Sequence, residues 1–192
     1  MTFVLFGDII PKKHCDRLFG RKGNIMSNPI VKITVEGYGT MTAELYPEKA
    51  PITVENFLKL AKSGFYEGLI FHRVINGFMI QGGGFDKDFV NKETGAIKGE
   101  FRANGWAKND IPHDPGVLSM ARTSDPNSAS SQIFIMHKKS PHLDGQYAAF
   151  GKVTEGLDIV NKIATVPTTY HGWYDDVPRV PVVIKSVEVV SE

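Results

Sequence analysis

Residues 30–45 carry the pattern that most constrains the fold. Apolar residues occupy every second position from Val31 to Val35 and again from Met41 to Leu45, and the positions between them are polar or charged. Gly-Tyr-Gly at 37–39 separates the two runs. Strict alternation directs every second side chain to one face of a β-strand, and a glycine turn between two such runs is typical of a hairpin. The pattern predicts an amphipathic β-hairpin with one face on a core.

Two helices and six further β-rich runs follow this hairpin. Apolar residues with the i, i+3, i+4, i+7 spacing begin after Pro51 and end before Gly64, and a second amphipathic stretch follows Thr154 with Leu157 on its apolar side. The β-rich runs are 69–75, 78–81, 117–121, 132–136, 147–153 and 182–190. Many short strands with two helices favour an antiparallel barrel or sandwich over alternating β-α-β units. The polar stretches 86–110 and 166–181 are predicted to be surface loops.

The first 27 residues differ in composition from the rest of the chain. A short apolar run, 3–6, is followed by Asp8 and then by basic residues without a regular period. We expect a leader over 1–27 that is not part of the fold, and one domain over 28–190. The apolar run is too short for a membrane span and lacks the basic start of a signal peptide. The only cysteine, Cys15, is typical of a reducing compartment, so we expect a cytoplasmic protein.

Charge and motif content exclude several function classes. The 22 basic and 21 acidic side chains give a formal charge of +1, which disfavours a nucleic-acid surface. The zincin, nucleophile-elbow, P-loop and dinucleotide-binding motifs are missing from the sequence. His137 and His142 come nearest to a ligand-like spacing, but a surface or loop role suits them better than zinc binding. No metal, cofactor or membrane partner is predicted.

Residues 71–85 combine a turn signal with an unusual mixture of side chains. Asn76-Gly77 predicts a hairpin whose two strands lie side by side. This turn brings together a cation, an amide and two apolar side chains, namely Arg73, Gln81, Phe78 and Met79. Such a mixture suits a pocket for a small apolar group with a polar attachment. Spacing alone leaves open a plainer interpretation, in which the cation is a surface ion-pair partner and the apolar residues are core.

The segment 71–85 resembles the signature of the cyclophilin family of peptidyl-prolyl cis-trans isomerases. Three further blocks, 116–121, 131–135 and 143–153, follow in the family's order and at close to its spacing. The resemblance covers roughly 28–190 and is to a bacterial-like, single-domain member. It implies a mainly β fold, a closed eight-stranded antiparallel barrel capped by two α-helices, with a filled interior and an external groove. It also implies rotation about X-Pro peptide bonds in assistance of protein folding, with no cofactor.

Site residues follow from the resemblance, position by position. Arg73 matches the catalytic arginine of the family, and Gln81 matches an amide expected to orient it. The other matching residues are expected to bind substrate: His72, Phe78, Met79, Ala121, Arg122, Thr123, Gln132, Phe134, His142, Leu143 and Tyr147.

The chain departs from the best-known family pattern at three of its positions. His142 replaces a tryptophan of many eukaryotic members, Tyr147 replaces a histidine, and Ile133 replaces the first of two phenylalanines. Tyr147 still offers an aromatic wall and a hydroxyl. The expected partners are proline-containing segments of client proteins, with at most weak cyclosporin binding because of His142. We expect a monomer, since a closed barrel has no free edge.

Two other classes of protein remain as alternatives. One is a scaffold or chaperone that binds proline segments without catalysis, and the retained Arg73 argues against it. The other is a lipocalin-like barrel with an internal ligand, and the large apolar residues of 31–45 argue against it. The aromatic residues of 166–181 are expected to pack on the barrel, in preference to extending the groove or meeting a partner.

Overall fold

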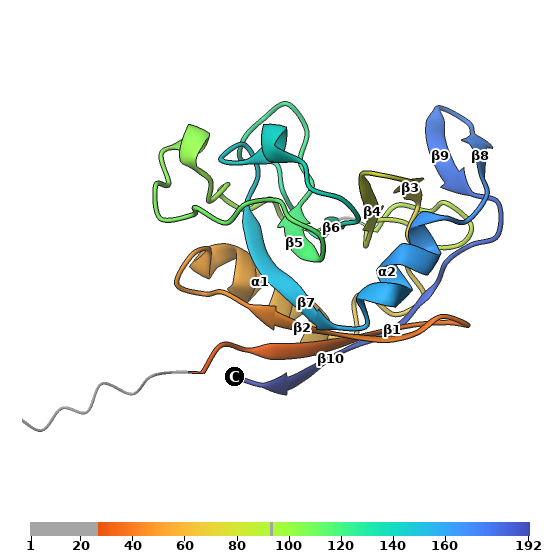
Figure 1. Cartoon of the computed structure of the whole chain (residues 1–192), viewed down its shortest axis with the longest axis horizontal. Coiled ribbons are helices and arrows are strands. Elements are labelled where there is room, and N and C mark those ends of the chain that lie inside the picture. Colours follow the sequence, from red (N-terminus) through yellow and green to blue (C-terminus); the bar gives the residue numbers. More distant parts are fainter. Residues whose placement is uncertain (1–26, 93) are drawn as a thin grey trace, which may run out of the picture.

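The computed structural model describes residues 27–92 and 94–192, so most of the predicted leader lies outside the described residues and the boundary at 27/28 stays a prediction. Ten strands, two α-helices and two short 3-10 helices make up the fold (Figure 1). They are β1 (Ile30–Val35), β2 (Gly39–Leu45), α1 (Pro51–Lys62), β3 (Arg73–Ile75), β4 (Met79–Gly82), η1 (Arg102–Asn104), β5 (Val117–Met120), β6 (Ile133–Met136), η2 (Pro141–Leu143), β7 (Ala149–Glu155), α2 (Leu157–Ala164), β8 (Thr168–His171), β9 (Tyr174–Pro178) and β10 (Ile184–Ser191).

The alternation of β1 and β2 places their apolar residues inside a curled sheet. The six apolar residues at alternate positions of 31–45 are each no more than 1% exposed, and they pair across the hairpin, as Ile33 does with Met41. They belong to one large cluster of buried side chains with residues from every strand of the sheet and both helices. Since apolar side chains fill the interior, an internal ligand site of the lipocalin kind is not supported.

The eight sheet strands follow the order β10-β1-β2-β7-β5-β6-β4-β3, and every neighbouring pair is antiparallel. The ladder ends at β3 and β10. The gap between these edges is joined by an isolated bridge between Ile70 and Val183 and by a hydrogen bond from the Phe71 N–H to the Val182 carbonyl, 2.9 Å. The mainly β, eight-stranded antiparallel fold with two helices is confirmed, with a short bridge at its seam in place of a full ladder.

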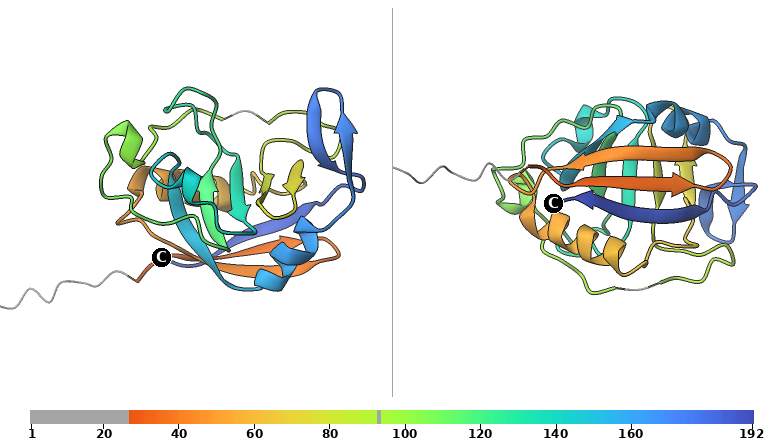
Figure 2. Two further views of the ribbon diagram at one scale, coloured as in Figure 1. Left: turned by 45° about the horizontal axis from the view of Figure 1, so that its top comes forward. Right: turned by 90° about the horizontal axis from the view of Figure 1, so that it is seen from below.

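Both predicted helices are present, and they lie on opposite sides of strands β1, β2 and β10 (Figure 2). In α1, Val54, Phe57 and Ala61 are buried, as their spacing predicts. In α2, Leu157 is 38% exposed, and Ile159 is buried in its place. Leu157 is the first residue of its helix, where the backbone has only just turned toward the sheet.

The N-terminus of α1 is capped by a side chain from a distant loop. Ala50 precedes the helix and has no side chain that can accept a hydrogen bond. The carboxylate of Glu100, which is fully buried, accepts hydrogen bonds from Ile52 N (3.0 Å), Thr53 N (2.8 Å) and Thr53 Oγ1 (2.7 Å). Free N–H groups and the positive end of the helix dipole both favour an anion here. Glu100 thereby fixes the 86–110 loop to α1.

The segment 166–181 differs from its prediction. Its residues 168–171 and 174–178 form the hairpin β8–β9, so the prediction of a loop is wrong there. Gly172, with φ +58°, occupies the turn, where a left-handed conformation favours glycine. Most side chains of this hairpin are exposed, so its strands show none of the alternation that identifies a half-buried strand.

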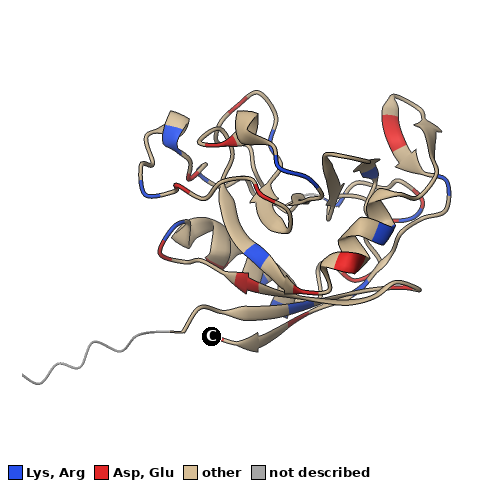
Figure 3. Ribbon diagram, viewed as in Figure 1, with Lys and Arg blue, Asp and Glu red and all other residues tan. Residues whose placement is uncertain are grey.

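Charged side chains of both signs are interspersed over the described part of the chain (Figure 3). Among the described residues, no helix has the length and apolar character needed to cross a bilayer.

Candidate active site

A row of side chains crosses four strands on the outer face of the sheet. The strand registers align Arg73 of β3 with Gln81 of β4, Gln81 with Phe134 of β6, and Phe134 with Ser119 of β5. Residues directly opposite in antiparallel strands share a face, so these four side chains leave the sheet together. The adjacent row faces the core and consists of Val74, Ile80, Ile135 and Leu118. Alternation therefore separates a functional face from a packing face.

The turn that carries Arg73 and Gln81 is fixed by a histidine. Gly77 has φ +82°, which glycine adopts without strain, and its N–H donates to Nδ1 of His137 at 3.0 Å. His137 lies in the loop that follows β6, which agrees with the predicted surface or loop role, but its side chain is buried, at 6% exposed. Burial lowers the pKa of His137, which keeps its ring neutral and able to accept this hydrogen bond.

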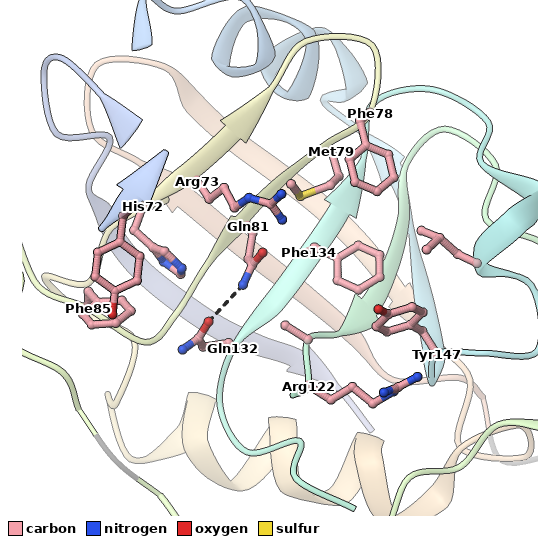
Figure 4. A pocket seen from close by; sticks show the side chains of 13 residues that line it. His72, Arg73, Phe78, Met79, Gln81, Phe85, Arg122, Gln132, Phe134 and Tyr147 are labelled. Atoms are coloured by element: carbon pink, nitrogen blue, oxygen red, sulfur yellow. Dashed lines mark hydrogen bonds between the residues drawn. The ribbon is translucent and has the colours of Figure 1, made fainter. Parts of the chain in front are cut away.

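Three residues of the outer row, Arg73, Gln81 and Phe134, line a groove of about 390 Å³, within the range of small-ligand sites. Its lining residues are His72, Arg73, Phe78, Met79, Gln81, Phe85, Ala121, Arg122, Gln132, Phe134, Leu143, Tyr147 and Tyr174 (Figure 4). Two predicted residues are not part of this lining. Thr123 forms a turn in which its N–H and hydroxyl both bond the Ser128 hydroxyl, and His142 stacks on Phe78 with ring centroids 5.7 Å apart. Phe85 and Tyr174 line the groove without having been predicted.

One end of the groove is a compact apolar pocket. Met79, Phe134 and Leu143 form its nearly buried floor and walls, each less than 8% exposed. Tyr147 meets Phe134 edge to face at 5.7 Å between ring centroids. This pocket is separate from the core inside the barrel, so an apolar group can enter it from the outer surface.

Behind the pocket wall lies a polar chain that the sequence did not reveal. The His113 ring stacks against Phe134 at 5.9 Å, its Nδ1 is 3.0 Å from the Asp144 carboxylate, and its Nε2 is 3.2 Å from the Ser119 hydroxyl. The order resembles a serine-histidine-aspartate triad, but Ser119 is fully buried and no substrate carbonyl can approach it. Burial lowers the pKa of His113, and the Asp144 carboxylate opposes that shift. The hydrogen-bonded set of Asp144, His113 and Ser119 therefore supports the Phe134 ring and has no nucleophilic role.

Two arginines line the groove, and their surroundings differ. The Arg122 guanidinium lies 4.6 Å from the centroid of the Tyr147 ring and donates to the carbonyls of Gln146 (3.0 Å) and Thr123 (2.8 Å). Arg73 is exposed, and no hydrogen bond or ion pair engages its guanidinium within residues 27–92 and 94–192. A substrate in the groove therefore meets Arg122, whose guanidinium is already hydrogen-bonded, and Arg73, whose guanidinium is available for a new hydrogen bond.

Gln81 is held by a neighbouring amide. Its Nε2 donates to Oε1 of Gln132 at 3.0 Å, which directs the Gln81 carbonyl oxygen away from Gln132 (Figure 4). This oxygen is an acceptor on the strand position directly opposite Arg73. The pair of glutamines thus fixes a carbonyl acceptor on the strand position opposite Arg73.

His72 lines the groove next to Arg73 and is only 3% exposed. Its ring meets Phe85 edge to face at 4.8 Å, and its Nδ1 has no partner among the described residues. Burial, with a smaller contribution from the Arg73 charge, lowers the pKa of His72 to about 4. The ring is therefore neutral at pH 7, and its Nδ1 is buried without a hydrogen bond to the described residues.

The pKa of His72 predicts a pH dependence of stability. An unfolded histidine titrates near 6.5, so between pH 6.5 and pH 4 the unfolded chain binds the additional proton and the folded chain does not. The free energy of unfolding is therefore unaffected by this group above pH 6.5, and the group lowers it by up to about 3 kcal/mol as the pH drops to 4. Urea unfolding at several pH values should show a smaller fall for His72→Gln. Identical pH profiles for the variant and the wild type would contradict the assignment.

Comparison with known proteins identifies a family that shares this sequence. Residues 30–189 match the family model described as cyclophilin type peptidyl-prolyl cis-trans isomerase/CLD. A peptidyl-prolyl cis-trans isomerase of Acinetobacter baylyi is 45% identical over 86% of this chain and 88% of the relative. Peptidyl-prolyl cis-trans isomerase B of Escherichia coli is 42% identical over 79% and 94%.

Solved structures that resemble this fold are also cyclophilins. A cyclophilin-type isomerase of Cryptosporidium parvum superposes with a TM-score of 0.71 at 30% identity, covering 86% of this chain and 99% of that one. The cyclophilin AquaCyp293 of Hirschia baltica superposes with a TM-score of 0.62 at 29% identity, covering 84% and 73%. The curled antiparallel sheet with two helices is thus shared with solved cyclophilin-type isomerases. The chain belongs to the cyclophilin-type peptidyl-prolyl cis-trans isomerase family.

Proposed function

We propose that the chain catalyses rotation about X-Pro peptide bonds in the groove, with Arg73 as its catalytic residue and the apolar pocket as the site of the proline ring. The observation that carries this proposal is the available Arg73 guanidinium at the edge of a pocket walled by Met79, Phe134 and Leu143. The test is exchange between the cis and trans forms of an Ala-Pro peptide, followed with and without the chain. Acceleration by catalytic amounts of the chain is expected, and an unchanged exchange rate would refute the proposal.

The chemical task is to lower a rotational barrier. Resonance gives the peptide C–N bond partial double-bond character, so rotation has a barrier of ~18–20 kcal/mol, and X-Pro bonds exchange in tens to hundreds of seconds. In the twisted state this resonance is lost, and the prolyl nitrogen becomes pyramidal and more basic. No bond breaks, so the reaction needs no nucleophile.

Arg73 suits this task because it interacts more strongly with the twisted state than with either planar state. A guanidinium N–H that points at the prolyl nitrogen donates to the lone pair that appears only on twisting. The group is permanently charged and planar, so it acts without proton transfer. Gln81 is the proposed positioning residue, since it lies opposite Arg73 in the β3–β4 ladder and its amide is anchored on Gln132.

The apolar pocket grips the ring while the preceding acyl group turns. Phe134, Leu143 and Tyr147 exclude water from the pyrrolidine. A dry environment also favours the twisted amide, because loss of resonance reduces its charge separation. Ala121 and Arg122, which follow β5 and line the groove, are the residues proposed to bind the substrate backbone as an added strand would.

One relative supports this choice of substrate. A structure of the Cryptosporidium parvum isomerase was solved in the presence of the dipeptide Ala-Pro, and it superposes on this chain with a TM-score of 0.69 at 31% identity. We extend that chemistry to this chain and propose proline-containing segments of client proteins as its partners. Assistance of folding in the cytoplasm, monomeric behaviour and at most weak cyclosporin binding belong to the same proposal.

Phe134→Ala is expected to weaken binding of a proline peptide about tenfold, because it removes the largest wall of the pocket. An NMR titration with an Ala-Pro peptide measures this, and circular dichroism confirms that the variant is folded. Phe134→Leu keeps most of the apolar volume and should lose less affinity. Unchanged binding in the folded Ala variant would place the proline elsewhere.

The non-catalytic scaffold remains the alternative function. A binder needs the apolar pocket but gains nothing from a cation with no partner in the described structure. The exchange measurement separates the two, since a scaffold binds the peptide and leaves the exchange rate unchanged.

A further inference from the structure

We propose that the groove continues past Arg73 into a second subsite that binds an aromatic side chain of the substrate, within about three residues of the proline. We call this subsite the aromatic wall and define it as His72, Phe85, Phe89, His171 and Tyr174. The proposal rests on the proposed function, because it assigns a specificity to the same substrate. The number of residues between the proline and the aromatic side chain is limited by the length of an extended peptide, which spans roughly 3.3 Å per residue.

Three residues of the aromatic wall, His72, Phe85 and Tyr174, line the same cavity as the proline pocket, and Phe89 and His171 pack behind them. Phe134 lies toward one end of the groove and His72 and Phe85 toward the other, with Arg73 between them (Figure 4). Leu143 belongs to the cluster of Phe134, and Tyr174 packs on Phe85. Strand β9, which carries Tyr174 at its start, lies against β3, which carries Arg73 (Figure 1). A peptide whose proline occupies the pocket and whose chain crosses Arg73 therefore reaches Tyr174.

The rings of the wall are packed together but not covered. Phe85 meets Tyr174 at 5.3 Å and 66°, and Phe89 stacks on His171 at 3.9 Å and 19°. Phe85 is 8% exposed, which makes it the base of the wall, whereas Tyr174 is 44% exposed. An aromatic side chain of a substrate can thus add to an existing edge-to-face arrangement, which is a favourable geometry for ring pairs.

Backbone strain is concentrated at the same place. Among the described residues, Phe89 (φ +60°) and Asp176 (φ +59°) are the only non-glycine residues in the left-handed region. Phe89 is part of the wall, and Asp176 follows Tyr174 by two positions in β9. Such conformations cost about 1–3 kcal/mol each and are typical of functional sites. Here they lie in the two segments that form the wall.

A neutral, buried histidine contributes to the base of the wall. His72 is only 3% exposed, its ring meets Phe85 edge to face at 4.8 Å, and its Nδ1 is buried without a partner in the described structure. Because burial lowers the pKa of His72 to about 4, the ring is uncharged at pH 7 and adds a neutral aromatic group to the groove lining.

The test compares peptides that differ by one ring. A panel based on Ala-Ala-Ala-Ala-Pro-Ala-Ala-Ala carries a single phenylalanine at each of the three positions before and after the proline in turn. Affinity is measured by NMR titration and turnover by exchange spectroscopy on the same samples. One of the positions is expected to bind about fivefold tighter than the all-alanine peptide, which corresponds to about 1 kcal/mol.

Variants connect that preference to the wall. Tyr174→Ala should reduce the ratio of affinities between the preferred phenylalanine peptide and the all-alanine peptide to about one. Tyr174→Phe should retain that ratio. Tyr170→Ala is the matched control: Tyr170 lies on the same hairpin, is 78% exposed and is not part of the groove lining, so this variant should retain the wild-type ratio.

Three results overturn the inference: no phenylalanine position with higher affinity, a preference that survives in Tyr174→Ala, or a preference lost equally in Tyr170→Ala. Failure of the proposed function looks different. In that case the exchange rates of all peptides stay at their uncatalysed values, whatever the titrations show. A fivefold ratio that depends on Tyr174 supports the wall in either case.

Discussion

Arg73→Ala is expected to lower kcat/KM for an Ala-Pro peptide by at least 100-fold, which is about 2.7 kcal/mol of transition-state stabilisation. The reason is that Arg73 is the one groove arginine whose guanidinium has no partner in the described structure, whereas Arg122 is bonded to two carbonyls and rests on Tyr147. The melting temperature should stay within a few degrees of the wild-type value, since an exposed side chain without bonds adds little stability. Exchange spectroscopy and thermal unfolding monitored by circular dichroism measure the two quantities.

Arg73→Lys is the matched control for charge. A lysine ammonium retains the positive charge but lacks the planar fork that aims two N–H groups in fixed directions. Its activity should lie between those of the wild type and the alanine variant. Wild-type kcat/KM in a folded Arg73→Ala sample would show that another group stabilises the twisted amide.

Glu100→Ala should cost about 3 kcal/mol of stability and lower the melting temperature by roughly 6–12 °C. The substitution removes the acceptor for three donors, the N–H groups of Ile52 and Thr53 and the Thr53 hydroxyl, and Thr53 is fully buried. It also removes the negative charge from the N-terminus of α1, where no local side chain replaces it. Thermal and urea unfolding measure the effect.

Two variants make that result specific. Glu55→Ala makes the same change of charge on an exposed face of α1 and should alter stability by less than about 0.5 kcal/mol. Glu100→Gln keeps one acceptor oxygen and should be intermediate between the wild type and Glu100→Ala. Equal stability for all three variants would mean that the cap contributes nothing to α1.

The regular part of the fold was predictable from local pattern. Alternation in 31–45 identified β1 and β2, since each strand buries one face, and the helical spacing after Pro51 identified α1. The β8–β9 hairpin escaped prediction because both of its faces are largely exposed, so no alternation marks it. Glu100 escaped for the opposite reason: a carboxylate in a polar loop is expected at the surface, and only the tertiary fold brings it to α1.

The site likewise combines residues that the sequence could identify with residues that only the tertiary fold brings together. The Asn76-Gly77 turn was sufficient to place Arg73 opposite Gln81, and the resemblance added residues such as Phe134 and Leu143 that line the same groove. Tyr174 and Phe85 were missed because they meet only through packing of β9 on β3, which no local sequence pattern encodes.

The most direct test of the central claim measures exchange on the enzyme itself. With an Ala-Pro peptide saturating the chain, NMR line shapes report the cis-trans rate of the bound peptide separately from its affinity. The account predicts a bound-state rate far above that of the free peptide for the wild type, and one reduced at least 100-fold in Arg73→Ala while the peptide remains bound. A bound-state rate that is unchanged by loss of the Arg73 guanidinium would contradict it.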